Sequence, residues 1–271
     1  MERGLVDTRQ QAASLIAAGR VLVAGTVADK PARLVAPAEP IELSGGPPRF
    51  VGRGGEKLDA ALTRFAIDVR GRRALDAGAS TGGFTDCLLQ AGASEVLAVD
   101  VGHGQLHERL RSDPRVVNLE RVDIRDMAPD TVGGAPVGVV TADLSFISVV
   151  RAVPVLVGPV TAPGADVVVL VKPQFEAGRA EASRGRGVIR DPSVHRRTLG
   201  EVADALSSAG AAIMGAMPSP ITGSAGNVEF LVHARTAEGA GRPQPPRAGR
   251  DAVSALLDDV VAEAHRHDPR G

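Results

Sequence analysis

The sequence predicts an α/β protein in which a doubly wound, mostly parallel β-sheet follows a small separate module. Largely apolar runs of strand length recur along the chain, at residues 74–77, 96–101, 116–119, 137–142, 166–171 and 228–232. Helix-like stretches separate most of them, at 83–91, 105–110 and 193–209. Continuous rather than alternating hydrophobicity is typical of strands covered on both faces, which favours a parallel sheet between two layers of helices.

The N-terminal module comprises residues 1–43. Residues 8–19 predict a short helix, with Thr8 as its N-cap and Gly19 at its end. Residues 20–27 predict a strand and a tight turn.

A stretch rich in Gly and Pro follows the module and predicts an interdomain linker over residues 44–53. The large domain then extends over 54–235 and opens with an amphipathic helix at 56–68. The remainder, 236–271, predicts a loop and a packed helix at 251–265, because apolar residues recur there on one helical face.

Composition excludes several classes of protein. The longest apolar runs are far shorter than the roughly 20 residues that span a bilayer, and the first residues lack the apolar core of a secretory signal. The single cysteine, Cys87, excludes an intramolecular disulfide and a cysteine-rich zinc site. We therefore expect a cytoplasmic protein without a membrane or metal partner. Its net charge of −1 means that any contact with nucleic acid requires local basic patches.

A glycine-rich turn connects the first strand to the next helix, in the segment Asp76–Phe84. Glycines let the backbone approach a ligand, and the helix N-terminus offers free N–H groups. Asp100 ends the second strand, where it could accept hydrogen bonds from ribose hydroxyls, and Asp123 follows the third strand, within reach of an adenine amino group. These features predict a nucleoside-bearing ligand that contacts Asp76, Gly78, Ser80, Thr81, Gly82, Gly83, Phe84, Asp100 and Asp123.

The acid at the start of this turn indicates which ligand it is. Asp76 stands two residues before Gly78, where its charge would repel a pyrophosphate but attract the sulfonium and amino groups of S-adenosylmethionine. The turn therefore favours methyl transfer over a dinucleotide-dependent reaction. The alternative is that the glycines only shape a turn.

Four charged residues form a second candidate group: Lys57, Asp143, Lys172 and Glu229. Lys172 directly follows a buried-strand pattern and precedes a proline, and a charged residue there is seldom present for packing. The others have alternative interpretations. Asp143 could cap the next helix, Lys57 could be an ordinary solvated residue, and Glu229 could be an edge-strand charge facing water.

These residues resemble the Lys-Asp-Lys-Glu tetrad of the FtsJ-type ribose 2′-O-methyltransferases. More closely, the chain resembles the TlyA (haemolysin A-like) family, which joins an S4 RNA-binding domain to such a methyltransferase. The motifs that carry the resemblance cover residues 3–232 and include Thr8–Ala12, Gly19–Val21, Lys30–Pro31, Arg53–Leu58, Asp76–Phe84, Gly102–Leu106, Ala142–Ser148, Lys172–Phe175 and Gly226–Phe230.

The resemblance implies a Rossmann-like methyltransferase fold with a seven-stranded sheet and Lys57, Asp143, Lys172 and Glu229 as the catalytic tetrad. It also implies that the substrate is cytidine 2′-hydroxyls of 16S or 23S ribosomal RNA near the subunit interface. We expect Lys172 to be the base, because burial and a neighbouring Lys57 would lower its pKa while Asp143 and Glu229 oppose that shift. We also expect a monomer.

Two features depart from the family pattern. The chain begins inside the first helix of the S4 module, which predicts either a shortened RNA-binding domain or a start site further upstream. His103 stands where the family often has tyrosine, a change that would affect the packing of the adenosine or have no effect.

Arginines supply the candidate RNA contacts. We expect phosphate binding by Arg3, Arg9, Arg20, Arg53, Arg184 and Arg186. Arg184 and Arg186 belong to a Gly- and Arg-rich stretch after the fifth strand, together with Arg179, Arg190, Arg196 and Arg197, which could equally be a solvated loop. Two other functions compete with RNA methylation: methylation of a small molecule or protein, and a membrane-active haemolysin.

Overall fold

The computed structural model describes residues 3–6, 9–17, 19–28, 30–45, 48–185, 187–238 and 249–266. The chain forms two compact units, Met1–Gly52 and Arg53–Gly271. The division falls inside the segment 44–53, where the sequence predicts a linker. No helix among the described residues is both long and apolar enough to cross a membrane.

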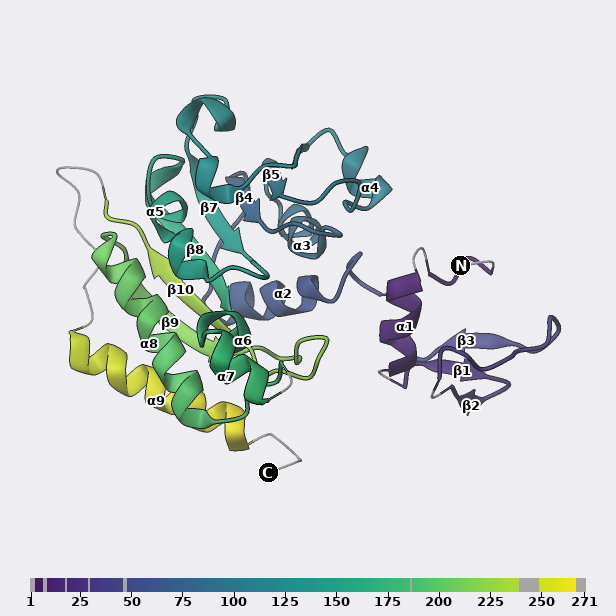
Figure 1. Cartoon of the computed structure of the whole chain (residues 1–271). Coiled ribbons are helices and arrows are strands. Elements are labelled where there is room, and N and C mark those ends of the chain that lie inside the picture. Colours follow the sequence, from purple (N-terminus) through teal and green to yellow (C-terminus); the bar gives the residue numbers. More distant parts are fainter. Residues whose placement is uncertain are drawn as a thin grey trace. The chain divides into compact units, whose positions relative to one another are not determined.

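The N-terminal unit contains one helix and one antiparallel sheet of three short strands (Figure 1). The helix is α1 (Arg9–Ala17), and the strands lie in the order β2 (Thr26–Val27), β1 (Val21–Val23) and β3 (Ile41–Leu43). The predicted helix, strand and turn are therefore present, whereas β3 was not predicted. Its core consists of Leu15, Val21, Val23 and Ala28.

Two local features explain the turns of this unit. Gly19 follows α1 with a φ of +67° and its N–H bonds to the Ile16 carbonyl, which ends the helix as predicted. Ala24 and Gly25 both have positive φ, as a two-residue hairpin turn between β1 and β2 requires. Thr8, the predicted N-cap, lies outside the described residues.

The C-terminal unit is built on a seven-stranded sheet in the order β6-β5-β4-β7-β8-β10-β9. The strands are β4 (Arg73–Ala77), β5 (Glu95–Asp100), β6 (Val116–Glu120), β7 (Val137–Ala142), β8 (Thr161–Val171), β9 (Ala212–Pro218) and β10 (Phe230–Arg235). The first five are parallel, and β10 is antiparallel to both of its neighbours. The predicted doubly wound, mostly parallel sheet is confirmed.

Helices cover both faces of this sheet (Figure 1). The α-helices are α2 (Gly54–Arg64), α3 (Gly83–Gln90), α4 (Glu108–Arg111), α5 (Val153–Leu156), α6 (Pro173–Glu176), α7 (Arg179–Arg184), α8 (Pro192–Ser208) and α9 (Arg250–Arg266). Three short 3₁₀ helices are η1 (Ile124–Asp126), η2 (Pro129–Val132) and η3 (Val149–Arg151). The helices α5, α8 and α9 share one core with the sheet, while α2 and α3 pack together on the opposite face.

Some predicted boundaries were wrong. The stretch 105–110 becomes helical only at Glu108, where the His107 side chain accepts a hydrogen bond from the Arg109 N–H. The helix predicted at 56–68 ends at Arg64, and Ala66 turns the chain with a φ of +52°. The strand β9 was missed, because the mixture of Ala, Gly and Pro in its sequence lacks the β-branched signature of the central strands.

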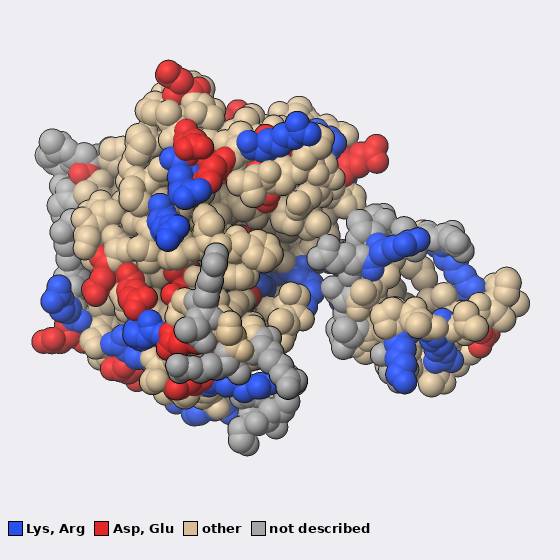
Figure 2. Space-filling model, viewed as in Figure 1, with Lys and Arg blue, Asp and Glu red and all other residues tan. Residues whose placement is uncertain are grey.

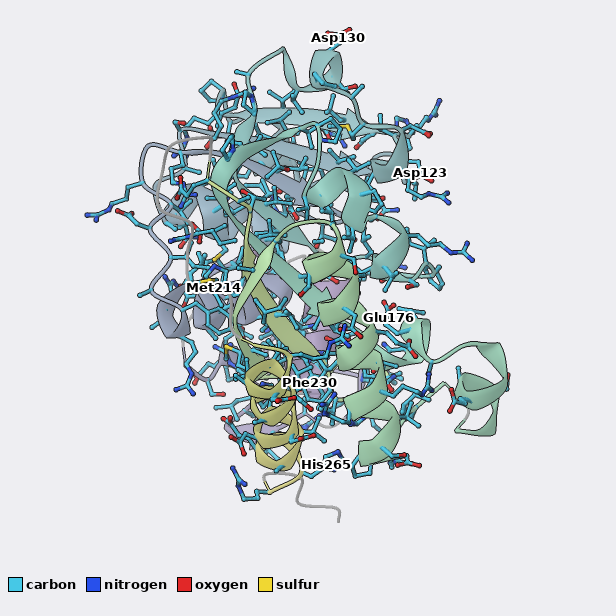
Figure 3. All side chains as sticks on the ribbon, turned by 90° about the vertical axis from the view of Figure 1, so that its left-hand side faces the viewer. Asp123, Asp130, Glu176, Met214, Phe230 and His265 are labelled. Carbon is cyan, nitrogen blue, oxygen red and sulfur yellow. The ribbon has the colours of Figure 1, made fainter. Side chains whose placement is uncertain are left out.

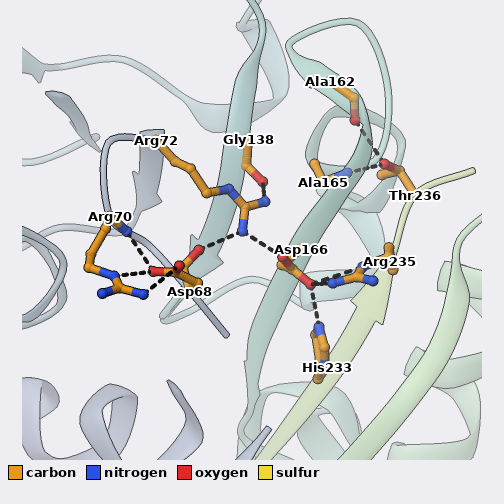
Figure 4. A network of polar contacts seen from close by, with 10 residues as sticks. All are labelled: Asp68, Arg70, Arg72, Gly138, Ala162, Ala165, Asp166, His233, Arg235 and Thr236. Atoms are coloured by element: carbon orange, nitrogen blue, oxygen red, sulfur yellow. Dashed lines mark hydrogen bonds and ion pairs between the residues drawn. The ribbon is translucent and has the colours of Figure 1, made fainter. Parts of the chain in front are cut away.

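A buried charge network joins several elements at the end of the sheet where β8 and β7 begin (Figure 4). Asp166 is 1% exposed, and it accepts hydrogen bonds from Arg72 at 2.7 Å, His233 Nε2 at 2.9 Å and Arg235 at 3.0 Å. Burial raises the pKa of Asp166, but the hydrogen bonds from His233 and Arg72 outweigh it and lower the pKa to about 2. The carboxylate therefore remains ionised as the counterion of this network.

Replacing this carboxylate should destabilise the fold. We expect Asp166→Ala to lower the free energy of unfolding at pH 7 by about 3 kcal/mol, because it removes the buried carboxylate that His233 and the partly exposed Arg72 and Arg235 share. Urea denaturation followed by circular dichroism measures the effect. Asp113→Ala is the matched control, since it removes a carboxylate from the surface pair with Arg115; an equal loss in both variants would contradict the prediction.

Candidate functional site

The candidate site lies at the sheet edge where the parallel strands end. Asp143 follows β7 and its N–H bonds to the Ala77 carbonyl at the end of β4. Lys172 follows β8, and because β10 is antiparallel, its first residue Phe230 pairs with Val171. Glu229 therefore reaches the same edge from the opposite chain direction, which the sequence pattern alone did not indicate.

The predicted turn Asp76–Phe84 forms a tight cradle at this edge. Gly78 and Gly82 have φ values of +85° and +98°, and Ser80 also adopts positive φ. Thr81 accepts a hydrogen bond through its carbonyl from the His107 N–H, and Gly83 opens α3. These conformations form the tight strand-to-helix turn that glycine permits, in which Ser80 is exposed.

Asp100 is held at the end of β5 by the backbone around it. Its carboxylate accepts hydrogen bonds from the Ser80 N–H at 2.8 Å and the Gly102 N–H at 2.7 Å. The neighbouring Val101 is 70% exposed, an unusual position for a large apolar side chain. The structure thus brings Asp100 and the glycine turn together, as predicted. Val101 was not among the ligand contacts predicted from the sequence.

Asp76 differs from the expectation of an acid that faces the ligand. Its side chain is fully buried and accepts hydrogen bonds from the hydroxyls of Thr85 at 2.6 Å and Thr141 at 3.4 Å. Burial raises the pKa of Asp76 to about 7, and the nearby charge of Asp143 acts in the same direction. The side chain of Asp76 therefore does not contact a ligand directly, and any electrostatic effect on a cationic ligand must act across the residues that cover it.

This pKa predicts a specific dependence of stability on pH. The folded protein retains a proton on Asp76 up to about pH 7, whereas the unfolded chain releases it near the ordinary aspartate pKa of 3.8, so stability falls as pH rises between these values. We expect Asp76→Asn, which preserves hydrogen bonding to the threonines, to remove about 3 kcal/mol of the loss between pH 5 and pH 8. Urea denaturation of both proteins at the two pH values tests this; parallel pH profiles would contradict it.

Two other predicted cofactor contacts are engaged within the protein. Asp123 caps η1, lies 2.5 Å from Arg125 as an ion pair and has a pKa lowered to about 2, chiefly by hydrogen bonds from that arginine. Phe84 is buried, and a β-carbon at Gly54 would stand 3.3 Å from its ring. His103 lies 2.7 Å from Glu120. The ligand contacts of Asp123 and Phe84 stay predictions.

The four predicted catalytic residues form two ion pairs. Lys57 and Glu229 form a buried hydrogen-bonded pair, although they are 172 positions apart in the chain. Lys172 Nζ lies 2.5 Å from Asp143 Oδ1, and it donates a hydrogen bond to Ser145 Oγ at 2.8 Å. A site of paired, largely buried charges can compensate the change in charge that accompanies a proton transfer.

The first residues of α2 link the two pairs. A β-carbon at Gly54 would stand 3.8 Å from Asp143 Oδ2, so the helix that carries Lys57 approaches Asp143. Arg53 donates a hydrogen bond to the Thr222 carbonyl at 2.7 Å, in the loop that leads to Glu229. Arg53, predicted as an RNA contact, is therefore bound to the rim of the site in this structure.

The sequence interpretation missed three residues beside the tetrad. Ser145 contacts Lys172, Phe146 is 89% exposed with a φ of +69°, and Glu176 binds the end of the same loop. The Phe146 and Phe175 rings lie 5.4 Å apart. An exposed aromatic residue in a strained conformation is a recognisable functional signal, but exposure is visible only in the folded chain.

The predicted RNA-binding arginines are in different situations. Arg3 donates to the backbone carbonyls of Ala36, Pro37 and Glu39, and Arg20 donates to the Ser44 carbonyl, so both also brace the N-terminal unit. Arg9 is exposed. The Arg184 side chain and Arg186 lie outside the described residues.

The basic stretch after the fifth parallel strand is less available than the sequence suggested. Arg196 pairs with Asp258 on α9, and Arg197 pairs with Glu181 and Glu201. Figure 2 shows acidic and basic side chains interspersed over the visible, coloured face of the C-terminal unit. Within the described ranges, no group of three or more His, Cys, Asp or Glu residues is arranged to hold a metal ion.

Comparisons with known proteins agree with this geometry. The FtsJ-like methyltransferase family matches residues 50–236, and the S4 domain matches residues 2–41. The 16S/23S rRNA (cytidine-2′-O)-methyltransferase TlyA of Mycobacterium tuberculosis is 48% identical over 237 residues, 87% of each chain. Hemolysin A of Brachyspira hyodysenteriae is 38% identical over 85% of this chain and 95% of its own.

A solved structure of a hemolysin-named protein from Streptococcus thermophilus is 38% identical, has a TM-score of 0.77 and covers 98% of this chain and 93% of that one. The similarity thus covers both the N-terminal unit and the C-terminal unit. The chain belongs to the FtsJ-like methyltransferases and, within them, to the TlyA family, with an S4 domain at its N-terminus.

Proposed function

We propose that this methyltransferase uses S-adenosylmethionine to methylate the 2′-hydroxyl of cytidine in ribosomal RNA of the 16S or 23S type. The observation that carries the proposal is the pairing of Lys172 with Asp143 beside the glycine cradle, at the edge that Lys57 and Glu229 also reach. The name of the M. tuberculosis relative describes the same reaction. We further propose that the protein acts in the cytoplasm as a monomer.

The cradle fits S-adenosylmethionine in three respects. Gly78 and Gly82 let the turn pack closely against Asp143 and against Leu106 and Leu110, Asp100 offers carboxylate oxygens suited to ribose hydroxyls, and Val101 provides an apolar surface beside it. We propose that the ligand is held by these residues together with Asp76, Ser80, Thr81, Gly83, Phe84 and Asp123. When bound, S-adenosylmethionine supplies a methyl group on a positively charged sulfur.

The protein's own residues then activate the ribose. A hydroxyl is a weak nucleophile, so its proton must leave as the oxygen attacks, and the Lys172 amine, acting in its uncharged form, is the group placed to receive it. Asp143 at 2.5 Å compensates the positive charge that develops on Lys172 and fixes the direction of the amine. The buried Lys57–Glu229 pair forms a second charged wall that orients the hydroxyl.

RNA binding is assigned to both units. In the N-terminal unit we propose phosphate contacts from Arg3, Arg9 and Arg20, and in the C-terminal unit from Arg53, Arg184 and Arg186. The family domains support the boundaries proposed here: S4 module 1–43, linker 44–53, methyltransferase domain 54–235 and C-terminal extension 236–271.

Phe146 should contribute by stacking on a base of the substrate. We expect Phe146→Ala to lower kcat/KM for RNA about 10- to 100-fold, because stacking on an aromatic ring contributes about 1–3 kcal/mol per base. The dissociation constant of S-adenosylmethionine should not change, and Phe146→Tyr, which keeps the ring, should remain close to wild type. Steady-state kinetics with an RNA substrate measure these values. An alanine variant with unchanged kcat/KM would rule out stacking at this position.

The experiment that tests the function uses S-adenosylmethionine labelled in its methyl group. The protein is incubated with small subunits, large subunits and free rRNA, and the RNA is digested to nucleosides for mass spectrometry. We expect label in 2′-O-methylcytidine, and none with the Lys172→Met variant as control. Label in a methylated base, or only in protein or a small molecule, would overturn the proposal.

A further inference from the structure

Two segments that carry the proposed catalytic residues are held together by side-chain contacts. The first is the loop from Asp143 to Val149, and the second runs from Lys172 to Glu176. Asp143 and Ser145 both contact Lys172, and the Phe146 ring contacts the Phe175 ring. The loop is anchored at its start by the hydrogen bond from Asp143 to Ala77.

Glu176 provides the anchor at the other end of this loop. Its Oε1 accepts a hydrogen bond from the Val149 N–H at 2.9 Å, and its Oε2 accepts one from Ser148 Oγ at 2.5 Å. Figure 3 shows Glu176 beside α8, among the short helices of this face. Both carboxylate oxygens are therefore used to hold a segment that lies 27 or 28 positions earlier in the chain.

A simple helix-capping role does not account for this contact. The three-residue helix η3 already has Ser148 as its N-cap, whose Oγ accepts from the Val150 N–H at 3.2 Å. Burial raises the pKa of Glu176, the nearby Glu201 adds to that, and the hydrogen bonds from Ser148 and Val149 only partly offset both. The carboxylate lies four residues after Lys172 and takes a second N–H of this helix end, that of Val149, in addition to the Ser148 hydroxyl.

The connection leads directly to the proposed base. The Glu176 and Phe175 N–H groups both bond to the Lys172 carbonyl, at 3.3 Å and 2.8 Å. Glu176 is therefore hydrogen-bonded through its backbone to Lys172 and through its side chain to the loop that carries Ser145 and Phe146.

We propose that Glu176 is a positioning residue that ties the Asp143–Val149 loop to α6 and so sets Lys172 against Asp143 and Ser145. This inference rests on the proposed function, because it assigns Glu176 to the geometry of that reaction. A displacement of a reacting group by about 1 Å can lower turnover about 100-fold. Losing the contact between Glu176 and the loop could therefore have a large effect on the rate.

Kinetics of two Glu176 variants test the proposal. Glu176→Ala removes both anchors and should lower kcat about 10- to 100-fold, with little change in the KM for S-adenosylmethionine. Glu176→Gln can still accept from Val149 and donate to Ser148, so it should restore kcat to within about threefold of wild type. Glu201→Gln, which alters the neighbouring acid in the surface pair with Arg197, is the matched control and should keep wild-type kcat.

A spectroscopic readout tests the anchoring without any substrate. The chain contains no tryptophan, so Phe146→Trp introduces a single reporter on the loop. Adding Glu176→Ala should lower the fluorescence anisotropy of this tryptophan, and Glu176→Gln should restore it. Unchanged anisotropy, or an alanine variant with wild-type kcat, would overturn the inference. If no RNA is methylated at all, the proposed function fails, while the anisotropy still decides whether Glu176 holds the loop.

Discussion

Replacing Lys172 by methionine is expected to lower methyl transfer by about 10²–10⁴-fold, the range contributed by a positioned acid or base. Lys172 is 9% exposed, and its amine lies 2.5 Å from Asp143 and 2.8 Å from Ser145 Oγ. The amine therefore lies at the sheet edge that carries the candidate site. Methionine fills a similar volume, which separates the loss of the amine from the loss of packing.

Lys172→Arg should be as inactive as the methionine variant. A guanidinium keeps the positive charge but does not release its proton in proteins, so it cannot act as a base. Single-turnover methylation of rRNA gives the rate, and calorimetry gives the dissociation constant of S-adenosylmethionine, which should remain within about twofold in both variants. If Lys172→Arg retained a tenth of the wild-type rate, a charge-based role would replace the proposed base.

Gly78→Ala should abolish activity through geometry alone. A β-carbon at Gly78 would stand 2.5 Å from the Asp143 carbonyl oxygen and 3.0 Å from its carbonyl carbon. This neighbour is backbone rather than a flexible side-chain end, so either the glycine turn or Asp143 must move. Because the turn belongs to the proposed cofactor site and Asp143 to the catalytic pair, we expect both S-adenosylmethionine binding and turnover to fall more than about 100-fold.

Gly71→Ala is the control for this prediction. Gly71 has a φ of +71°, close to the +85° of Gly78, but a β-carbon at Gly71 would meet no atom within 4 Å apart from those of its chain neighbours. The two variants therefore share the strain of a positive φ and differ in the collision. Thermal denaturation establishes that both are folded, and equal losses of cofactor affinity in both would show that strain, rather than the approach to Asp143, is responsible.

Most of the fold could be predicted because it is encoded locally. The central strands are buried on both faces, so their sequences are continuous apolar runs such as Val167–Val171, and the glycine turn is marked by residues that tolerate positive φ. The edge strand β9 escaped prediction and the start of the short helix α4 was placed too early, since both sequences carry weak local preferences.

The residues of the candidate site could be predicted from the sequence, but their ion-pair partners could not. Lys172 directly follows a buried-strand pattern, where a charge is out of place. Lys57, Asp143 and Glu229 each allow an ordinary structural interpretation, and the family resemblance marks them. Which charge pairs with which depends on distances of a few ångströms between segments far apart in the chain. The sequence predicted two lysines opposed by two acids, and the structure assigns the partners, Glu229 to Lys57 and Asp143 to Lys172.

By itself, the sequence determined the doubly wound sheet and the glycine turn, because these depend on local composition, and its family motifs marked the four charged residues. Only the tertiary structure decided that Asp76 is buried and hydrogen-bonded to Thr85, that Phe146 is exposed, and that Glu176 bonds to the end of the Asp143–Val149 loop. Burial and hydrogen-bond partners arise when distant segments pack, and no local pattern specifies them.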